Sequence, residues 1–288
     1  MPEAAYPTPL ERAPDGLSHR GNVYLKREDV HELGSFKWRG SLPTLTAYRD
    51  RGATRVVTSS TGNHGAATAW AAEQLGLEAV VFVPETVSRT KLALLEGLGA
   101  ETRIGGTDLD ASKDLARAYA AVERAPFFED GAEPVQYAGY ESIAEEIVAQ
   151  LGGAPGAVVV PVGNGALLAG VGTRLHHRVP KTSRVGVVAK AAPVMALSLA
   201  TGHAVECDEC ETFADGLAVR VALPAAVTTL RTATDELFTV SERSIAVALM
   251  HYAEVGIRVE GAAAASLAAL DRVASPGPIV LLVTGRNI

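Results

Sequence analysis

Two stretches of the chain share one plan: an apolar strand, a glycine-containing loop, a helix and a second apolar strand. The first stretch runs from Val56 to Val83 and the second from Val158 to Val188. Both loops carry Gly-Asn at the turn, Gly62-Asn63 in the first and Gly163-Asn164 in the second. Strands joined through a helix pair in parallel, and ligands of such sheets bind at the carboxyl ends of the strands, beside helix N-termini. The repeat therefore predicts parallel sheets and two loops that could face one ligand.

The same alternation of short apolar strands with alanine- and leucine-rich helices continues to the end, where "GAAAASLAALDRV" precedes "PIVLLVTG". It predicts an α/β protein with two doubly wound domains, whose mainly parallel sheets are covered on both faces. No proline- or serine-rich linker separates the halves, so we expect the domains to interleave. The predicted large domain comprises 1–50 and 131–288, and the predicted small domain comprises 51–130.

Charge and composition exclude some classes of partner. The 288 residues carry a formal net charge of −7, whereas nucleic acids and anionic membranes are bound by basic surfaces, so we expect neither as a partner. The N-terminus lacks the apolar core of a signal peptide, and no apolar run approaches the roughly 18 residues that span a bilayer. We therefore expect a cytoplasmic protein. Cys207, Cys210 and His203 could bind zinc, but a fourth ligand is not evident, and we expect reduced thiols without a function.

The loop "PVGNGALLAG" has the features of a phosphate-binding turn. Gly163 and Gly165 let backbone N–H groups converge, and a helix beginning near Ala166 or Leu167 would add the positive end of its dipole. The alternative is a tight strand-to-helix turn in which the glycines serve packing alone. The loop lacks the lysine of a Walker motif and the G-x-G-x-x-G spacing of a dinucleotide site.

The first loop, "SSTGNHG", is richer in polar side chains. It presents hydroxyl groups, an amide and an imidazole where a helix begins, on Ser59, Ser60, Thr61, Asn63 and His64. A helix N-terminus lined with such groups suits a carboxylate. The alternative is an ordinary N-cap followed by a surface histidine.

Lys37 lies between two large apolar residues in "GSFKWRG". One interpretation is a helix capped by Ser35, from which the lysine extends to water with its stem on Trp38. The other is an amine kept away from water by Phe36 and Trp38, which helps it act as a nucleophile.

Five segments, taken in order, resemble the motifs of fold-type II pyridoxal-phosphate enzymes, and in particular the serine/threonine dehydratase and serine racemase branch. They extend from Leu25 to Asn287 and read "LKREDVHELGSFKWRG", "SSTGNHGAATAWAA", "PVGNGALLAGVG", "TFADGLAVR" and "LLVTGRN". The resemblance implies a fold like that of the tryptophan synthase β-subunit, pyridoxal 5'-phosphate as cofactor, a small amino acid as substrate and a homodimer.

The resemblance also implies a role for individual residues. Lys37, next to Phe36, would form a Schiff base with the cofactor, and Thr284 would face its pyridine nitrogen. The phosphate would be held by Gly163, Asn164, Gly165, Ala166 and Leu167. Asn63 would bind the phenolic oxygen, and the substrate carboxylate would be surrounded by Ser60, Thr61, Asn63 and His64.

Several positions depart from the family pattern. Asn164 and Ala166 stand in what is often a run of glycines, and Arg286 interrupts a Gly-Gly-Asn, where it could reach phosphate or solvent. Tyr140 replaces a glutamine, so we expect it to shape the substrate pocket, with Phe213 and Ala214 nearby. Dehydratases and racemases with a divalent metal have carboxylates where this chain has Val188 and Val194, so we predict no metal there.

The resemblance predicts an ammonia-lyase that eliminates water from a β-hydroxy amino acid. An amino-acid racemase or a β-replacement enzyme of the same fold is the first alternative. Thr61 occupies the position of the racemase serine, and its hydroxyl keeps racemisation open. A protein that binds a phosphate ligand without catalysis is the second alternative, although the combination of Lys37, Asn63 and Thr284 argues against it.

Overall fold

The computed structural model describes residues 7–18, 20–208 and 210–287. They form two compact units. Unit 1 contains residues 37–139, and unit 2 contains the described residues before and after it. The chain passes from unit 2 to unit 1 between Phe36 and Lys37, and returns within α5 (Pro134–Leu151), after Gly139. The sequence predicted the small domain at 51–130, so unit 1 begins earlier and ends later than that range.

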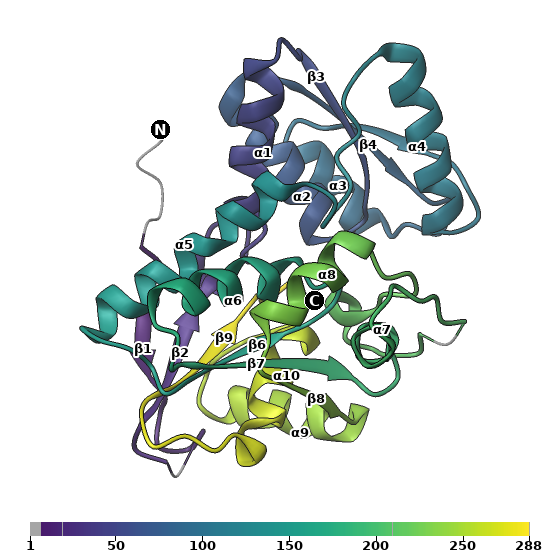
Figure 1. Cartoon of the computed structure of the whole chain (residues 1–288). Coiled ribbons are helices and arrows are strands. Elements are labelled where there is room, and N and C mark those ends of the chain that lie inside the picture. The colour runs from purple at the N-terminus through teal and green to yellow at the C-terminus, as the bar shows by residue number, and fades with distance from the viewer. Residues whose placement is uncertain (1–6, 19, 209, 288) are drawn as a thin grey trace. The chain divides into compact units, whose positions relative to one another are not determined.

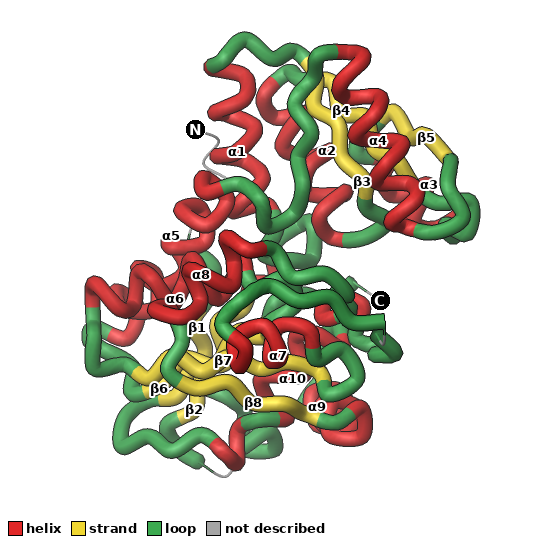
Figure 2. The backbone as a smooth tube through the Cα atoms, turned by 45° about the vertical axis from the view of Figure 1, so that its right-hand side comes forward, coloured by secondary structure: helices red, strands yellow, loops and turns green. Residues whose placement is uncertain are grey.

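Unit 1 is built on a three-stranded parallel sheet with the order β3-β4-β5 (Figure 2). Its strands are β3 (Arg55–Ser59), β4 (Glu78–Val83) and β5 (Glu101–Ile104). Its own helices are α1 (Trp38–Asp50), α2 (Asn63–Leu75), α3 (Arg89–Gly97) and α4 (Leu109–Glu123). Apolar side chains of β3 and β4 pack on small residues of α4, in a cluster of Val57, Val80, Phe82, Ala116 and Ala120.

Unit 2 is built on a six-stranded sheet with the order β1-β2-β9-β6-β7-β8, parallel except for the edge strand β1. Its strands are β1 (Leu10–Arg12), β2 (Val23–Arg27), β6 (Ala157–Pro161), β7 (Ser183–Ala189), β8 (Glu236–Val240) and β9 (Ile279–Val283) (Figure 1). Every residue of β6 and β9 is buried, as expected for central strands covered on both faces.

The helices of unit 2 cover this sheet. Besides most of α5 they are α6 (Ala166–Arg178), α7 (Val194–Thr201), α8 (Pro224–Ala233), α9 (Glu242–Glu254) and α10 (Gly261–Ala268). Short 3₁₀ turns occupy Glu28–Val30, Asp215–Leu217 and Leu270–Arg272. Alanines of α10 pack closely on β6 and β9, because a small side chain lets helix and sheet approach.

The predicted repeat is present as β3–α2–β4 in unit 1 and β6–α6–β7 in unit 2. In both cases the helix begins at or just after the Gly-Asn turn. The predicted fold class, two interleaved α/β units with mainly parallel sheets, is confirmed. Among the described residues no helix is long and apolar enough to cross a membrane.

Candidate active site

In unit 2 the Gly163 loop follows β6 and leads directly into α6. A Cβ on Gly163 would lie 2.3 Å from the carbonyl oxygen of Gly216, a backbone atom that cannot easily move aside. Gly165 has a φ of +90°, which favours glycine, and its Cβ would meet Leu230. Asn164 Oδ1 accepts a hydrogen bond from the backbone N–H of Ala166 at 3.1 Å, so a side chain supports this turn. The glycines thus serve packing, and they also leave backbone at the N-terminus of α6 uncovered by side chains.

Thr284 follows β9, the strand that pairs in parallel with β6, so both segments leave the sheet at its carboxyl edge. The side chain of Thr284 is buried, and its hydroxyl donates a hydrogen bond to Glu260 Oε1 at 3.4 Å. Gly285 follows, where a Cβ would lie 2.7 Å from the same carboxylate oxygen. A carboxylate therefore lies next to the hydroxyl that was predicted to face a ring nitrogen.

The backbone before Lys37 is held against this C-terminal segment. Phe36 N–H donates to the carbonyl of Thr284 at 3.1 Å, and Ser35 forms a β-bridge with Gly285. Arg286 donates to the carbonyl oxygens of Asp29 and His31. Arg286 is therefore directed at backbone of unit 2, and neither of the roles considered for it from the sequence, phosphate binding or exposure to solvent, is needed to explain it.

Lys37 is the first residue of unit 1 after Phe36 and the N-cap of α1, and no side chain caps that helix. The expectation of a cap from Ser35 was wrong, because residues 35 and 36 are bonded to the C-terminal segment instead. The side chain of Lys37 is only 13% exposed, and its Nζ lies 2.5 Å from Asp130 Oδ2. Trp38 is completely buried and packs edge-on against Trp70. A lysine that extends freely to water is therefore excluded.

The Ser59 loop of unit 1 lies between β3 and α2. Ser60 Oγ accepts the N–H of Gly62 at 3.2 Å, and α2 begins at Asn63 without a side-chain cap on Gly62. Ser60, Thr61 and Asn63 are partly exposed. Ser59 Oγ is buried and has no hydrogen-bond partner within the described parts of the chain. Open helix N–H groups beside hydroxyls suit an anion such as a carboxylate.

His64 lies behind this loop and not on the surface. Its Nε2 is 3.0 Å from Thr58 Oγ1 and 3.2 Å from the carbonyl oxygen of Phe128. Thr58 itself donates to Phe128, so the histidine Nε2 carries the hydrogen and donates to both oxygens. Burial lowers the pKa of His64 more strongly than the nearby Asp130 carboxylate raises it. The alternative of a surface histidine was wrong, and the ring is neutral at physiological pH.

The residues expected to shape the substrate pocket differ in exposure. Tyr140 is completely buried, with its ring 5.1 Å from that of Phe36 in unit 2. Ala214 is also buried, whereas Phe213 is 49% exposed. Tyr140 therefore acts first as a packing partner of the residue that precedes Lys37.

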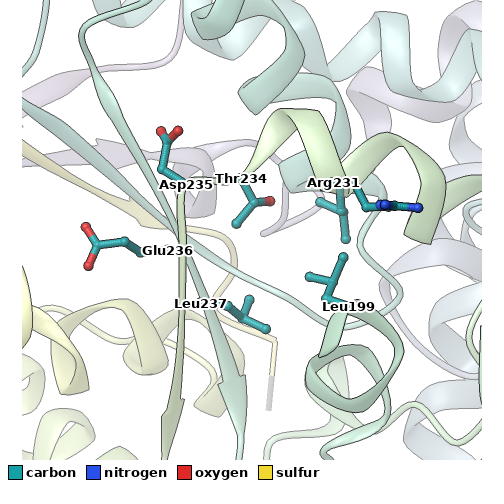
Figure 3. Close-up of a pocket in the computed structure, with 7 residues that line it drawn as sticks. Leu199, Arg231, Thr234, Asp235, Glu236 and Leu237 are labelled. Carbon is teal, nitrogen blue, oxygen red and sulfur yellow. The ribbon is translucent and has the colours of Figure 1, made fainter. Parts of the chain in front are cut away.

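A pocket of about 330 Å³ lies where α8 ends and β8 begins (Figure 3). Two carboxylates, Asp235 and Glu236, stand beside Thr234 in its lining. Arg184 binds Asp235 through two nitrogens and lowers the pKa of that carboxyl group. This ion pair joins β7 to the start of β8, and we interpret it as structural.

Cys207 and Cys210 are free thiols. No group of three or more histidine, cysteine, aspartate or glutamate side chains in the described ranges is placed to hold a metal ion.

Comparison with known proteins decides the family. The model of the family described as "Pyridoxal-phosphate dependent enzyme" matches residues 2–285. The chain belongs to this family. It is 33% identical to the L-threonine ammonia-lyase of Geobacter sulfurreducens over 271 residues, which is 92% of this chain and 67% of the relative. It is 36% identical to the biosynthetic L-threonine dehydratase of Mycobacterium bovis over 297 residues, covering 98% and 68% of the two chains.

Solved structures of family members agree with this assignment. A threonine deaminase from the organism given as T.th. superposes with a TM-score of 0.89 at 31% identity, covering 98% of this chain and 92% of that one. Threonine deaminase isoform 2 of Solanum lycopersicum gives 0.91 at 29% identity, covering 98% and 84%. The predictions of a fold-type II enzyme and of pyridoxal phosphate as cofactor are confirmed.

The residues of this enzyme fit the cofactor. A phosphate is bound by backbone N–H groups at a helix N-terminus, and the Gly163 loop presents such a turn, kept open by two glycines that no other residue could replace without a clash or strain. An amine, Lys37, and a buried hydroxyl, Thr284, lie in the segments bonded to each other through Phe36. These are the donor types that an aldehyde and a pyridine nitrogen require.

Two polar residues of these segments were missed from the sequence, Asp130 and Glu260. Glu260 precedes a small-residue helix and could have been noticed as a lone acid beside apolar residues. Asp130 lies in "FFEDGAEP" among other acids, and nothing in that stretch distinguishes it from Glu129 or Glu133.

Proposed function

We propose that the chain is an ammonia-lyase that eliminates water from a β-hydroxy amino acid of the serine and threonine class. The products are a 2-oxo acid and ammonia. The observation that carries the proposal is the position of the Gly163 loop, Thr284 and the backbone leading into Lys37 at the carboxyl ends of adjacent strands. The reaction class is supported by relatives at 30–36% identity that are named threonine dehydratase or threonine ammonia-lyase.

In this proposal both units contribute to holding the cofactor. Lys37 binds the aldehyde carbon, next to Phe36, and Thr284 contacts the pyridine nitrogen. Asn63 donates to the phenolic oxygen. The phosphate is held by Gly163, Asn164, Gly165, Ala166 and Leu167, with the positive end of α6 behind them.

When bound, pyridoxal phosphate withdraws electrons from the α-carbon and so stabilises the negative charge left when its proton is removed. Lys37 Nζ accepts that proton, a role that its shielded setting favours. Ser60, Thr61 and Asn63 hold the substrate carboxylate at the N-terminus of α2, which fixes the direction of the Cα–H bond. The β-hydroxyl group then leaves as water, and hydrolysis of the resulting enamine gives the 2-oxo acid and ammonia.

His64 was predicted to touch the substrate carboxylate, but its ring is committed to Thr58 and Phe128. We therefore assign it a supporting role behind the carboxylate loop. Tyr140, buried against Phe36, acts on the substrate by fixing the wall of the pocket, while the exposed Phe213 is free to contact a substrate side chain.

A screen for 2-oxo acid release tests the proposal. Purified protein with pyridoxal phosphate is incubated with L- and D-serine, threonine, 3-hydroxyaspartate and phenylserine, and released 2-oxo acids are measured as hydrazones. We expect the L-serine or L-threonine reaction to be fastest. A protein that binds no pyridoxal phosphate would contradict the proposal as a whole, and binding without oxo-acid release from any of these would contradict the reaction.

A homodimer in the cytoplasm completes the proposal. It rests on the family resemblance alone, and light scattering coupled to size-exclusion chromatography tests the oligomeric state. A mass near that of a single chain, 29.9 kDa, would contradict the dimer.

A further inference from the structure

Asp130 lies at the same edge of the unit 1 sheet as the carboxylate loop. Phe127 forms a parallel bridge with Val57 of β3, and Phe128 N–H donates to the carbonyl of Val57 at 2.8 Å. The segment therefore runs alongside β3 in the same direction. Asp130 emerges just beyond the carboxyl end of β3, where Ser59 also ends that strand.

The carboxylate of Asp130 is fixed from more than one side. Oδ2 lies 2.5 Å from Lys37 Nζ, and Oδ1 accepts a hydrogen bond from Gln136 Nε2 at 2.7 Å. Gln136 is itself oriented, because its Oε1 accepts the N–H of Gly131 at 2.7 Å. His64 Nδ1 lies 3.6 Å from Oδ1. Gln136 is buried, so this amide serves Asp130 and the adjoining turn and not the solvent.

Asp130 stays ionised in this setting. Burial by itself favours the neutral acid, but the charge of Lys37, the nearby His64 and the hydrogen bonds from Lys37 and Gln136 outweigh burial and hold the pKa of Asp130 well below its usual range. A permanent negative charge is thus aimed at the amine of Lys37.

We infer that Asp130 is a positioning residue for Lys37, holding its ammonium group in the cofactor-free protein and stabilising the charge whenever Nζ carries a proton. The inference rests on the proposed role of Lys37 as the cofactor lysine. It follows the arrangement of other activated nucleophiles and bases, in which a third group orients the residue that reacts. Only the uncharged amine attacks an aldehyde, so the Lys37–Asp130 pair must open before the cofactor can be bound covalently.

The rate of cofactor loading tests the inference without any substrate. Cofactor-free protein is mixed with pyridoxal phosphate at a series of pH values, and the rate at which the yellow absorbance appears is recorded. An opposite charge at this distance typically shifts the pKa of its partner by about one to three units toward the charged form. We therefore expect Asp130→Asn to load about 10-fold faster near pH 7, with its rate profile moved toward lower pH.

Three further variants make the outcome specific. Asp130→Glu keeps the charge and should restore most of the wild-type profile. Glu129→Gln removes the same charge one position away, where the side chain binds Arg117 and Lys113 of α4, and should load like the wild type. Asp130→Ser removes the charge with a smaller side chain and gives the same comparison if the asparagine variant does not fold.

Borohydride reduction and peptide mass spectrometry separate the two hypotheses. If wild-type protein gains no label on Lys37, the proposed function fails. If wild-type protein is labelled on Lys37 but Asp130→Asn and Asp130→Ser keep the wild-type rate profile, the inference about Asp130 is wrong and the proposed function stands.

Discussion

The two halves of the candidate site are built from different materials. In unit 2 the Gly163 loop uses backbone: its glycines are fixed by a close approach to Gly216 and by a positive φ, and the charge that it offers comes from a helix dipole. In unit 1 Lys37 is paired with a titratable side chain, Asp130, which is held in turn by the amide of Gln136.

This difference matches what each half has to do. A phosphate keeps its charge throughout a reaction and is served by rigid backbone donors that never titrate. An amine that attacks an aldehyde and then accepts a proton must change its charge, and neighbouring side chains can stabilise both states. We therefore expect substitutions in unit 1 to change rates and pH profiles, and substitutions in the Gly163 loop to change cofactor affinity.

The largest effect is expected at Lys37. Lys37→Ala should lose the yellow absorbance, and 2-oxo acid release should fall by about 100- to 10,000-fold, the usual contribution of a positioned general base. Lys37→Arg is the matched control, because it keeps a cation beside Asp130 but cannot react with an aldehyde. Equal inactivity of both variants shows that the amine matters and not the charge. An active Lys37→Arg enzyme would overturn the role of Lys37.

The next effect is expected at Gly165, on the backbone side. Gly165→Ala forces a side chain into a φ of +90° and toward Leu230, and such strain costs about 1–3 kcal/mol. We expect the dissociation constant of pyridoxal phosphate to rise about 10- to 100-fold, while kcat at saturating cofactor changes little. Gly202→Ala at the end of α7 is the control, since its φ is +77° but no atom lies within 4 Å of the new Cβ. Equal cofactor affinity in the two variants would mean that the Gly165 turn does not serve the phosphate.

A smaller effect concerns the pH dependence of stability in unit 1. The pKa of His64 is lowered by burial, so the unfolded chain binds a proton that the folded chain does not. Stability from this residue is complete above about pH 6.5 and is lost as the pH falls, by at most about 1.4 kcal/mol per pH unit. Asp130, also with a lowered pKa, contributes in the same direction only below about pH 4.

Melting temperatures of the cofactor-free protein between about pH 7.5 and 5, a range that spans the ordinary pKa of histidine, check the role of His64. His64→Gln should flatten the decline over this range, because glutamine does not titrate. His177→Gln, at an exposed histidine of α6, should leave the decline as it is. Parallel curves for wild type and His64→Gln would show that the buried ring does not control acid stability.

The fold and the phosphate side were readable from the sequence because their causes are local. Glycine after an apolar strand, followed by a helical pattern, specifies a strand–turn–helix unit within a few residues, and α2 and α6 begin at or next to the predicted turns. Val159 and Leu281 are buried simply because their strands are apolar throughout.

The amine side was only partly readable because its contacts join distant parts of the chain. Lys37 could be identified by its motif, but its partner Asp130 is 93 positions away and resembles its acidic neighbours in sequence. The start of α1 was assigned to a Ser35 cap, yet the tertiary bond from Phe36 to Thr284 determines it. Arg286 likewise finds its partners 257 and 255 positions away.

The smallest predicted effect is a change in selectivity at Thr61. This residue is partly exposed at the open N-terminus of α2, and its hydroxyl is the candidate for the second acid or base that racemisation needs. Elimination needs only Lys37 on the opposite side, so Thr61→Ala should lower 2-oxo acid release no more than the loss of one hydrogen bond allows, roughly 10-fold. Any interconversion of L- and D-serine, followed by chiral chromatography, should fall further than that. Thr61→Ser keeps the hydroxyl and should preserve the ratio of the two activities. If both activities fall equally in Thr61→Ala, the hydroxyl merely binds the carboxylate, and the loop in unit 1 then works as a fixed anion site much as the Gly163 loop does.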